Sequence, residues 1–253
     1  MELFLVALVN LVVGLLIGWS GIAGFLIPMF YAGYLGYLVP EALALSFAAF
    51  GASGVIGSIS YYRTDDLPLR PAVLLSIGSF IGAMLGVWLN YLIPTSTAKM
   101  ILFVVVLVSG ISILLRERKS KNDTESETSG KKAISDWWLI ILGFLTGAMC
   151  ALSGAGGPIL VMPLLVLLGF RIRQAVGMSL FNSIFIAIPS FIGYWKIAGS
   201  SKLLPVLFVS LVGQIVGVLI GSKTSSKIKQ RPLKMTVAIF SIGISLYMIL
   251  NLV

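Results

Sequence analysis

Long apolar runs separated by short polar stretches dominate the chain. Each run approaches the ~20 residues that a helix needs to cross the ~30 Å of hydrocarbon in a bilayer. The runs are too long and too numerous for a β-barrel, whose strands would alternate over ~10 residues. The pattern therefore predicts an all-α, polytopic membrane protein. The runs cover residues 3–19, 42–62, 71–89, 100–115, 137–152, 175–195, 203–221 and 235–253.

The same landmarks occur twice along the chain at a nearly constant spacing. Ser20 and Ser153 are 133 positions apart (153 − 20), and a Gly-x3-Gly-x3-Gly series at 78–86 returns 135 positions later (213 − 78). Such a small drift is expected from a duplicated half. We therefore expect a first repeat at 1–115, a polar linker at 116–136 and a second repeat at 137–253. Other pairs 133 residues apart are Gly21 and Gly154, Gly24 and Gly157, Ala42 and Ala175, Ser46 and Ser179, and Tyr61 and Tyr194.

Each repeat begins with an apolar stretch that is too long for one crossing and barely long enough for two, at ~1.5 Å per residue. These stretches, 3–38 and 137–170, are predicted to be hairpins of two short or broken helices. Three ordinary transmembrane helices then follow in each repeat. They are expected at 42–62, 71–93 and 97–115, and at 175–195, 203–221 and 233–251.

The positive charges predict how the chain is inserted. If the linker is cytoplasmic, fifteen of the 18 Lys and Arg residues lie on the cytoplasmic side, all but Lys99, Lys196 and Lys202. Such an excess of Lys and Arg is typical of the cytoplasmic loops of proteins in an inner (plasma) membrane. A hairpin returns to its starting side, and three further spans make an odd number of crossings. The two repeats are therefore predicted to be inverted, with both termini outside the cytoplasm, as in many secondary transporters.

Composition excludes several classes of function. The chain is 58% hydrophobic and 11% charged, and its formal net charge of +9 lies in loops, so we expect the charge to fix orientation and no nucleic acid as a partner. A single cysteine, Cys150, excludes an internal disulfide, and the lack of histidine excludes imidazole-based metal and haem sites. We expect no cofactor. An enzyme or thiol-handling protein that uses Cys150 is a further hypothesis, but the sequence shows no general base, group of metal ligands or catalytic triad to accompany this cysteine.

Two interrupted apolar segments are the main candidates for a binding site. Ser153-Gly154-Ala155-Gly156-Gly157-Pro158 interrupts the second hairpin, and Ser20-Gly21-Ile22-Ala23-Gly24 interrupts the first. A break in a helix inside hydrocarbon frees backbone groups that protein, water or a ligand must satisfy. The alternative is that small residues only allow close helix packing. Two copies at matching places favour a site that comprises Ser20, Gly21, Gly24, Ser153, Gly154, Gly156 and Gly157.

Polar side chains within the spans form a second group of candidates. Ser46 and Ser179 recur at equivalent positions, and Asn182 and Gln214 carry amides that need partners in lipid. Each amide either lies on the transport pathway or joins two helices. The alternative for the serines is a hydrogen bond to the carbonyl four residues earlier. The Gly-x3-Gly series is expected to be a close helix contact, either within one protomer or in a homodimer, and Tyr61 and Tyr194 are expected at the membrane interface.

The chain resembles the sulfite exporter TauE/SafE family, also called the toluene sulfonate uptake permease family. The likeness lies in the Ser153–Gly157 motif with Pro163, in its repetition from Ser20 to Pro28, and in Ala-Val-Gly-Met-Ser-Leu at 175–180. It covers nearly the whole chain apart from the linker. The first copy departs from the pattern, because Ala23 and Phe25 replace glycines and Pro28 follows after a shorter interval. The resemblance implies transport of small sulfur-containing or carboxylate anions, with the second copy as the safer binding site.

The leading functional hypothesis is therefore a secondary transporter of small anions that works by alternating access around the paired breaks. No Asp or Glu falls at the centre of a predicted span, so proton coupling through a buried carboxylate is not expected, whereas an edge acid such as Glu41 remains a candidate. The alternative is an anion channel or facilitator in which the same breaks form a selectivity constriction.

Overall fold

The computed structural model describes all residues except 1, 22, 120–134, 199–200, 225–229 and 251–253. The described residues form helices and turns and contain no strand, which confirms the predicted all-α class. Seven of these helices are long and apolar enough to cross a membrane, judged by length and composition. They are α1 (Glu2–Ser20), α3 (Val39–Arg63), α4 (Leu69–Leu92), α5 (Thr95–Lys119), α6 (Asp136–Ser153), α8 (Ile172–Ala198) and α9 (Leu204–Thr224). The last predicted run corresponds to α10 (Gln230–Leu250), outside this set of seven.

Both predicted hairpins are present, but their two arms differ in length. In the second half, α6 is followed after a break by α7 (Gly157–Leu167), whose 11 residues extend only ~17 Å. In the first half, the returning arm is irregular. It consists of η1 (Ala23–Phe25), α2 (Leu26–Met29) and the π-helix η2 (Phe30–Tyr34).

The two breaks share one backbone conformation. Gly21 and Gly154 adopt left-handed φ values of +76° and +70°, which a residue with a Cβ rarely adopts. The N–H of Gly154 donates to the Cys150 carbonyl at 2.8 Å, and that of Gly21 donates to the Ile17 carbonyl at 2.7 Å. Each glycine therefore ends the first arm in the same way, since this bond closes the last helical turn and turns the chain out of the helix.

Glycine contacts hold the two halves together. In α4, Gly78, Gly82 and Gly86 lie so close to the backbone of α6 that an added Cβ would overlap its carbonyl groups. In α9, the corresponding glycines, Gly213, Gly217 and Gly221, lie against the backbone of α1. The first hairpin helix of each half thus packs against a helix of the other half. The structure places the Gly-x3-Gly series at contacts within the protomer.

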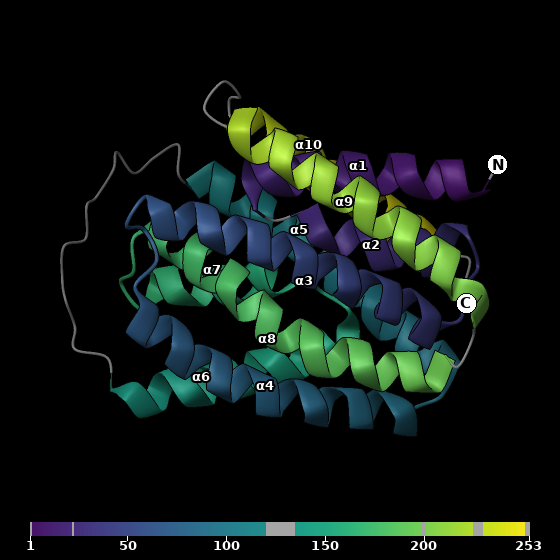
Figure 1. The fold of residues 1–253 in the computed structure, drawn as a ribbon, viewed down its shortest axis with the longest axis horizontal. Helices are drawn as coiled ribbons and strands as arrows, with labels where there is room; N and C mark the ends of the chain where they lie inside the picture. The colour runs from purple at the N-terminus through teal and green to yellow at the C-terminus, as the bar shows by residue number, and fades with distance from the viewer. Residues whose placement is uncertain (1, 22, 120–134, 199–200, 225–229, 251–253) are drawn as a thin grey trace.

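The helices are arranged around a central crossing of the two halves. In Figure 1, α3 and α8 cross the middle, α1, α9 and α10 lie above them, and α4 and α6 lie below. Helix α1 begins on the right of the view, whereas α6 begins on the left, so the first helices of the two halves run in opposite directions. Both chain ends are on the right. Opposite insertion of the halves in a membrane stays a prediction, as do the repeat boundaries.

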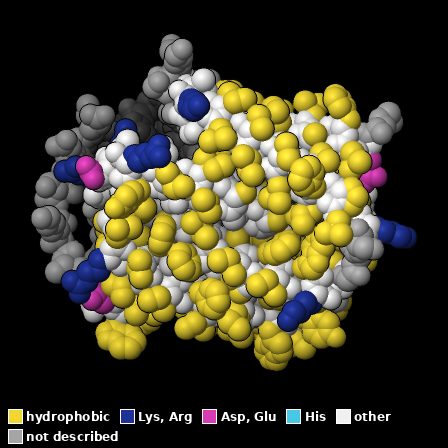
Figure 2. All heavy atoms as spheres, in the orientation of Figure 1, with side chains coloured by type: hydrophobic (Ala, Val, Ile, Leu, Met, Phe, Trp, Pro, Cys, Tyr) yellow, Lys and Arg dark blue, Asp and Glu magenta, His cyan; other side chains and the backbone are white. Residues whose placement is uncertain are grey.

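The surface has the character expected in lipid. Hydrophobic side chains cover most of the face shown in Figure 2, and charged side chains lie mainly toward its two ends. Large apolar residues such as Phe4, Trp137 and Phe208 are each about 70% exposed, at 73%, 72% and 69%. Exposed apolar surface on this scale needs a hydrocarbon environment, because water would penalise it. The chain is therefore a multi-pass membrane protein.

Candidate functional site

The two helix breaks meet in the interior of the protein. A Cβ added to Gly154 would lie 3.4 Å from the Pro28 Cβ, and one added to Gly156 would lie 3.9 Å from the Gly24 Cα. The second-half break thus faces the first-half break across a few ångströms. A side chain at Gly154 would overlap Leu43, whereas a Cβ on Gly156 would make only ordinary contacts, so the close approach requires glycine at Gly154 alone of these two positions.

A small cavity lies at this meeting point. Its volume of about 20 Å³ is close to the space that one water molecule needs. Its wall carries the hydroxyl-bearing residues Ser53 and Ser183, and none of the described residues that line it is charged. The lining residues are Ile17, Gly21, Gly24, Phe50, Ser53, Gly156, Pro158, Ile159, Leu180 and Ser183.

The surroundings of the paired glycines follow the 133-residue spacing. A Cβ on Gly154 would overlap the Leu43 side chain, and one on Gly21 would meet Val176 at 3.1 Å; positions 43 and 176 are 133 apart (176 − 43). Gly24 and Gly157 face equivalent positions too. A Cβ on Gly24 would lie 2.9 Å from the ring of Phe50, and one on Gly157 would lie 2.6 Å from the hydroxyl of Ser183.

The same backbone positions therefore surround the site in both halves, but the side chains at those positions differ. Phe50 and Ser183 occupy equivalent positions, 133 residues apart (183 − 50). One glycine thus faces an aromatic ring while its counterpart faces a hydroxyl group. The hydroxyl makes the second-half break the more polar side of the cavity.

The start of α7 offers backbone donors at the cavity. Gly156 precedes the helix without a side-chain cap, and Pro158 has no N–H. Among the described residues, no hydrogen bond is made by the N–H of Gly156 or Gly157, whereas the Ile159 N–H donates to the Gly156 carbonyl at 3.2 Å. Free N–H groups at the positive end of a helix dipole attract negative charge. The break can therefore stabilise an anion without any charged side chain.

The candidate serines make local bonds in this conformation. Ser153, Ser46 and Ser179 each donate to the carbonyl four residues earlier, at 2.6 Å in every case. The Ser153 oxygen also accepts from the Ala155 N–H at 3.3 Å. In this conformation these three serine hydroxyls therefore bond to the backbone of their own helices, which is the alternative to a binding role. The side chain of Ser20 lies outside the described residues.

The two candidate amides have different surroundings. The Gln214 Nε2 donates to the Ser53 hydroxyl at 2.7 Å, and Ser53 in turn donates to the Ala49 carbonyl at 2.8 Å. Gln214 therefore reaches the cavity through Ser53. Asn182 is fully buried, and neither amide atom has a partner among the described residues, but Asn182 does not line the cavity.

Sequence reasoning missed several residues of the cavity wall. Ser53 and Ser183 are the most informative, because they lie seven residues after Ser46 and four after Ser179 and so share a helix face with a candidate already identified. Nothing in the sequence distinguishes Phe50 from other apolar residues, so its place in the cavity wall could not be predicted.

The expectation for Tyr194 was wrong. It is fully buried instead of interfacial, and its hydroxyl donates to the Ala151 carbonyl at 2.7 Å, three residues before Gly154. An aromatic residue beside a lysine resembles an interfacial residue in sequence, but here the ring stacks on Phe47 inside the protein at 5.9 Å.

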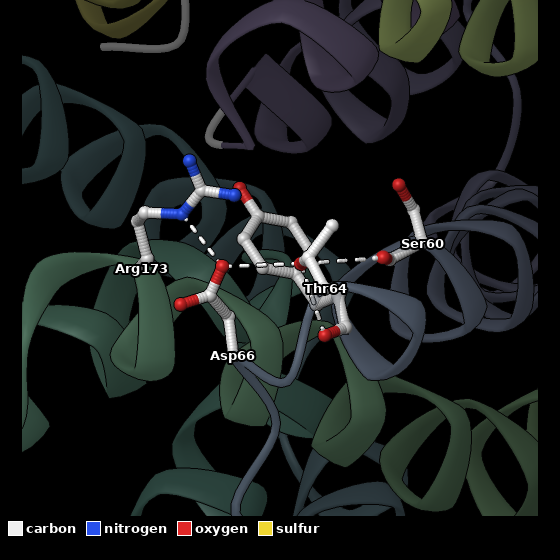
Figure 3. A network of polar contacts seen from close by, with 5 residues as sticks. Ser60, Thr64, Asp66 and Arg173 are labelled. Carbon is white, nitrogen blue, oxygen red and sulfur yellow. Dashed lines mark hydrogen bonds and ion pairs between the residues drawn. The ribbon is translucent and has the colours of Figure 1, made fainter.

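Polar contacts also join the two halves at the end where α3 finishes and α8 begins. Figure 3 shows Arg173 of α8 pairing with Asp66 of the α3–α4 turn, at 2.7 Å. The Thr64 hydroxyl donates to the same carboxylate at 3.1 Å. This network lies at the molecule's end and is separate from the cavity. It links the start of α8 to the turn that follows α3.

The comparisons with known proteins identify transporters. The family model described as "Sulfite exporter TauE/SafE" matches residues 4–248. "Probable membrane transporter protein YdhB" of Bacillus subtilis (strain 168) is 25% identical over 240 residues, which cover 91% of this chain and 93% of that protein. A "Probable membrane transporter protein" of Haemophilus influenzae (strain ATCC 51907 / DSM 11121 / KW20 / Rd) is 24% identical and covers 98% of both chains. No solved structure matches the chain.

Proposed function

Since the chain belongs to the sulfite exporter TauE/SafE family of membrane transporters, we propose that it is a secondary transporter that moves small anions by alternating access. The anions we expect are sulfur-containing ones, such as sulfite and sulfonates, or related carboxylates. The paired breaks form the substrate site. The central linker lies in the cytoplasm and both termini lie outside, in the inner (plasma) membrane, as the distribution of Lys and Arg suggests.

The observation that carries this proposal is the meeting of the two breaks at one cavity. Glycines from both halves, Gly21 and Gly24 from the first and Gly156 from the second, line the same small space. In transporters built from repeats, substrates bind where broken helices of the two repeats meet near the middle of the membrane. The position therefore fits a substrate site better than a site of simple helix packing.

The chemistry of the cavity favours an anion of modest charge. Its wall includes Gly156, whose N–H makes no hydrogen bond among the described residues, and none of the described lining residues is charged. Hydrogen-bond donors in a medium of low dielectric stabilise negative charge strongly, while the lack of a fixed cation allows the anion to leave again. A sulfite or carboxylate group has oxygen acceptors that fit this arrangement.

The size of the cavity suggests a closed state of the transport cycle. Space for about one water molecule is too small for a sulfite ion, so the helices around the breaks must separate before a substrate binds. The short arm α2 contacts α1, α3 and α5, and the short arm α7 contacts α6 and α8, while α1 and α6 are held backbone to backbone by α9 and α4. Movement of these arms is the smallest change that enlarges the site.

The proposal is tested by counterflow of labelled sulfite, sulfonates and carboxylates in proteoliposomes. Gly157→Ala places a methyl group 2.6 Å from the Ser183 hydroxyl, and Gly156→Ala adds a methyl group at the cavity with no atom nearer than 3.7 Å. We expect Gly156→Ala to fold normally and to reduce counterflow at least about tenfold, because it fills a site that tolerates little added volume.

Two variants serve as controls in the same assay. Gly157→Ala should also reduce counterflow because of its overlap with Ser183, and combining it with Ser183→Gly removes the overlap and should recover part of the activity. Gly243→Ala in α10, where nothing lies within 4 Å of the added methyl group, should leave counterflow unchanged. Wild-type rates in both Gly156→Ala and Gly157→Ala would exclude the proposed site, and conductance steps without counterflow would identify a channel.

A further inference from the structure

Polar side chains extend from an exposed end of the molecule into its interior, toward the cavity. Glu2, at the start of α1, accepts a hydrogen bond from the Tyr37 hydroxyl. The Tyr37 ring stacks on Tyr31, with 5.8 Å between ring centroids and 16° between planes. The Tyr31 hydroxyl then accepts from the Asn10 Nδ2 at 2.9 Å. Asn10 lies eight residues along α1 from Glu2, or ~12 Å into the molecule.

The series continues on α9 and ends at the cavity. The Tyr31 hydroxyl also lies close to the Ser210 hydroxyl, and Gln214 follows Ser210 by one helical turn. The Gln214 Nε2 donates to the Ser53 hydroxyl, which lines the cavity. We call this series the polar file. It consists of Glu2, Tyr37, Tyr31, Asn10, Ser210, Gln214 and Ser53.

Two oxygen atoms of the polar file have no partner among the described residues. They are Oδ1 of Asn10 and Oε1 of Gln214, and both side chains are fully buried, with 0% exposure. The amide nitrogens are in use, because Asn10 Nδ2 donates to Val6 and Tyr31 and Gln214 Nε2 donates to Ser53. Buried acceptors normally have partners. The file therefore offers neutral oxygens for a group that brings positive charge or a proton.

The charge at the outer end of the file agrees with this chemistry. Glu2 contacts Tyr37, and Glu41 accepts the Leu38 N–H at 3.0 Å close to the same turn. Two carboxylates at an entrance repel anions and attract cations. The donor-rich helix break and the oxygen-rich polar file thus suit ligands of opposite charge.

The second half of the chain does not repeat the polar file. Adding 133 to the first-half positions gives Gly143 for Asn10, Leu164 for Tyr31 and Phe170 for Tyr37. Ser53 corresponds to Ile186 in the same way. The second hairpin nevertheless packs against the opposite half through the same glycine contacts. The fold therefore does not require these polar groups, which points to a function for them.

We propose that the polar file binds and conducts the coupling cation of transport, a small monovalent cation that is either Na⁺ or a hydrogen ion carried as hydronium. The cation enters from water beside Glu2 and reaches the cavity through the oxygens of Asn10, Gln214 and Ser53. It neutralises the anion held at the helix breaks, and no covalent bond is made or broken in the protein. This inference rests on the proposed anion transport.

The test measures how counterflow of sulfite depends on each cation. In one arm Na⁺ replaces choline at constant pH, and in the other the pH is lowered without Na⁺. We expect one of the two changes to stimulate the wild type at least about fivefold, the low end of a typical coupling between two sites. Asn10→Leu and Gln214→Leu should each reduce this stimulation to none, because a leucine side chain offers no oxygen.

The matched control is Asn90→Leu, which removes another buried amide. The Asn90 Nδ2 donates to the Leu152 carbonyl at 2.8 Å, outside the polar file, so this variant should keep the stimulation. Asn10→Asp has nearly the same shape as the wild type and adds a negative charge. It should lower the half-saturating cation concentration at least about fivefold. Thermal stabilisation of purified protein by Na⁺ or by lower pH gives a second reading of binding.

The outcomes separate this inference from the proposed function. Absence of counterflow under every cation condition contradicts anion transport itself. Counterflow that neither cation stimulates overturns the polar file as a coupling path, as does full stimulation in Asn10→Leu and Gln214→Leu. If leucine variants do not fold, an unchanged cation dependence in Asn10→Asp also overturns it.

Discussion

Three glycines with nearly the same backbone conformation have very different surroundings. Gly36, Gly21 and Gly154 have φ values of +71°, +76° and +70°. A Cβ on Gly36 would meet no atom within 4 Å, one on Gly21 would meet Val176 at 3.1 Å, and one on Gly154 would overlap Leu43. Conformational strain is therefore common to all three, and steric overlap distinguishes them.

Alanine at each position should separate these two costs. We expect Gly36→Ala to lower the free energy of unfolding by ~1–2 kcal/mol, the cost of a left-handed conformation. Gly21→Ala should cost slightly more, and Gly154→Ala a further ~1–3 kcal/mol because of overpacking. The check is the thermal midpoint of each purified variant in one detergent. Equal midpoints for Gly36→Ala and Gly154→Ala would contradict the packed environment of the second break.

Residue types that carry a strong local rule were predictable, and residues selected by tertiary packing were not. The glycines of the breaks stood out because only they permit a left-handed turn inside an apolar run. Ser53 and Ser183 became visible only when α3, α8 and α7 were placed together, since serine in a helix most often bonds to its own backbone. Phe50 faces the cavity instead of lipid, and no local pattern distinguishes these two apolar surroundings.

At the scale of elements, the presence of two arms in each hairpin was predictable, but the lengths of the arms were not. Length indicated that 3–38 and 137–170 each contain two arms, as the structure shows. It did not indicate that the first arm is a full helix and the second a short one. The position of Gly21 and Gly154 decides this division, because each ends its helix after 18 or 19 residues. The mixed helix types of η1, α2 and η2 depend on packing against α1 and α3 and have no clear local signal.

The close helix pairs provide a prediction that uses the duplication. Gly82→Ala in α4 would overlap the Phe144 carbonyl of α6, and Gly217→Ala in α9 would overlap the Leu11 carbonyl of α1. Both contacts are with backbone, which cannot move aside as a side chain can. We expect each variant to lower the free energy of unfolding by ~1–3 kcal/mol or more, measured by thermal unfolding in detergent.

Gly243→Ala is the matched control for these two variants. It replaces a helical glycine where nothing lies within 4 Å, so it should be neutral or stabilise by up to ~1 kcal/mol through helix propensity. A large loss in Gly82→Ala with none in Gly217→Ala would show that α4–α6 and α1–α9 are not equivalent contacts.

At the scale of the whole molecule, the halves share a backbone plan and differ in polarity. Helices α1 and α6 each pack against a glycine-rich helix of the other half, and the two breaks meet between them. The first half carries the acidic entrance at Glu2 and most of the polar file, while the second half supplies Ser210 and Gln214 of the file and the backbone donors of α7. A shared backbone plan with unequal side chains fits the proposed binding of two ligands of opposite charge at one centre.

The direction of the helices predicts where the chain ends lie relative to the membrane. Helix α1 begins and α10 ends on one side of the molecule, while α5 ends and α6 begins on the other (Figure 1). Single cysteines introduced at Glu2 and Leu250, in a Cys150→Ala background, should therefore both react with an impermeant maleimide added outside intact cells. A cysteine at Ser135, beside the linker, should react only after the membrane is opened.

The charge bias gives the physical reason for this orientation and a way to challenge it. Cytoplasmic loops retain Lys and Arg, and fifteen of the 18 lie on the linker side in the predicted arrangement. A cysteine at Leu145 is the control for reagent that enters the bilayer, because this residue is 56% exposed on the lipid-facing side of α6. It should react neither in intact cells nor after the membrane is opened. Labelling of Glu2 and Leu250 from opposite sides would mean an odd number of crossings. It would exclude inverted repeats, because two halves that insert in opposite senses must return the chain to its starting side.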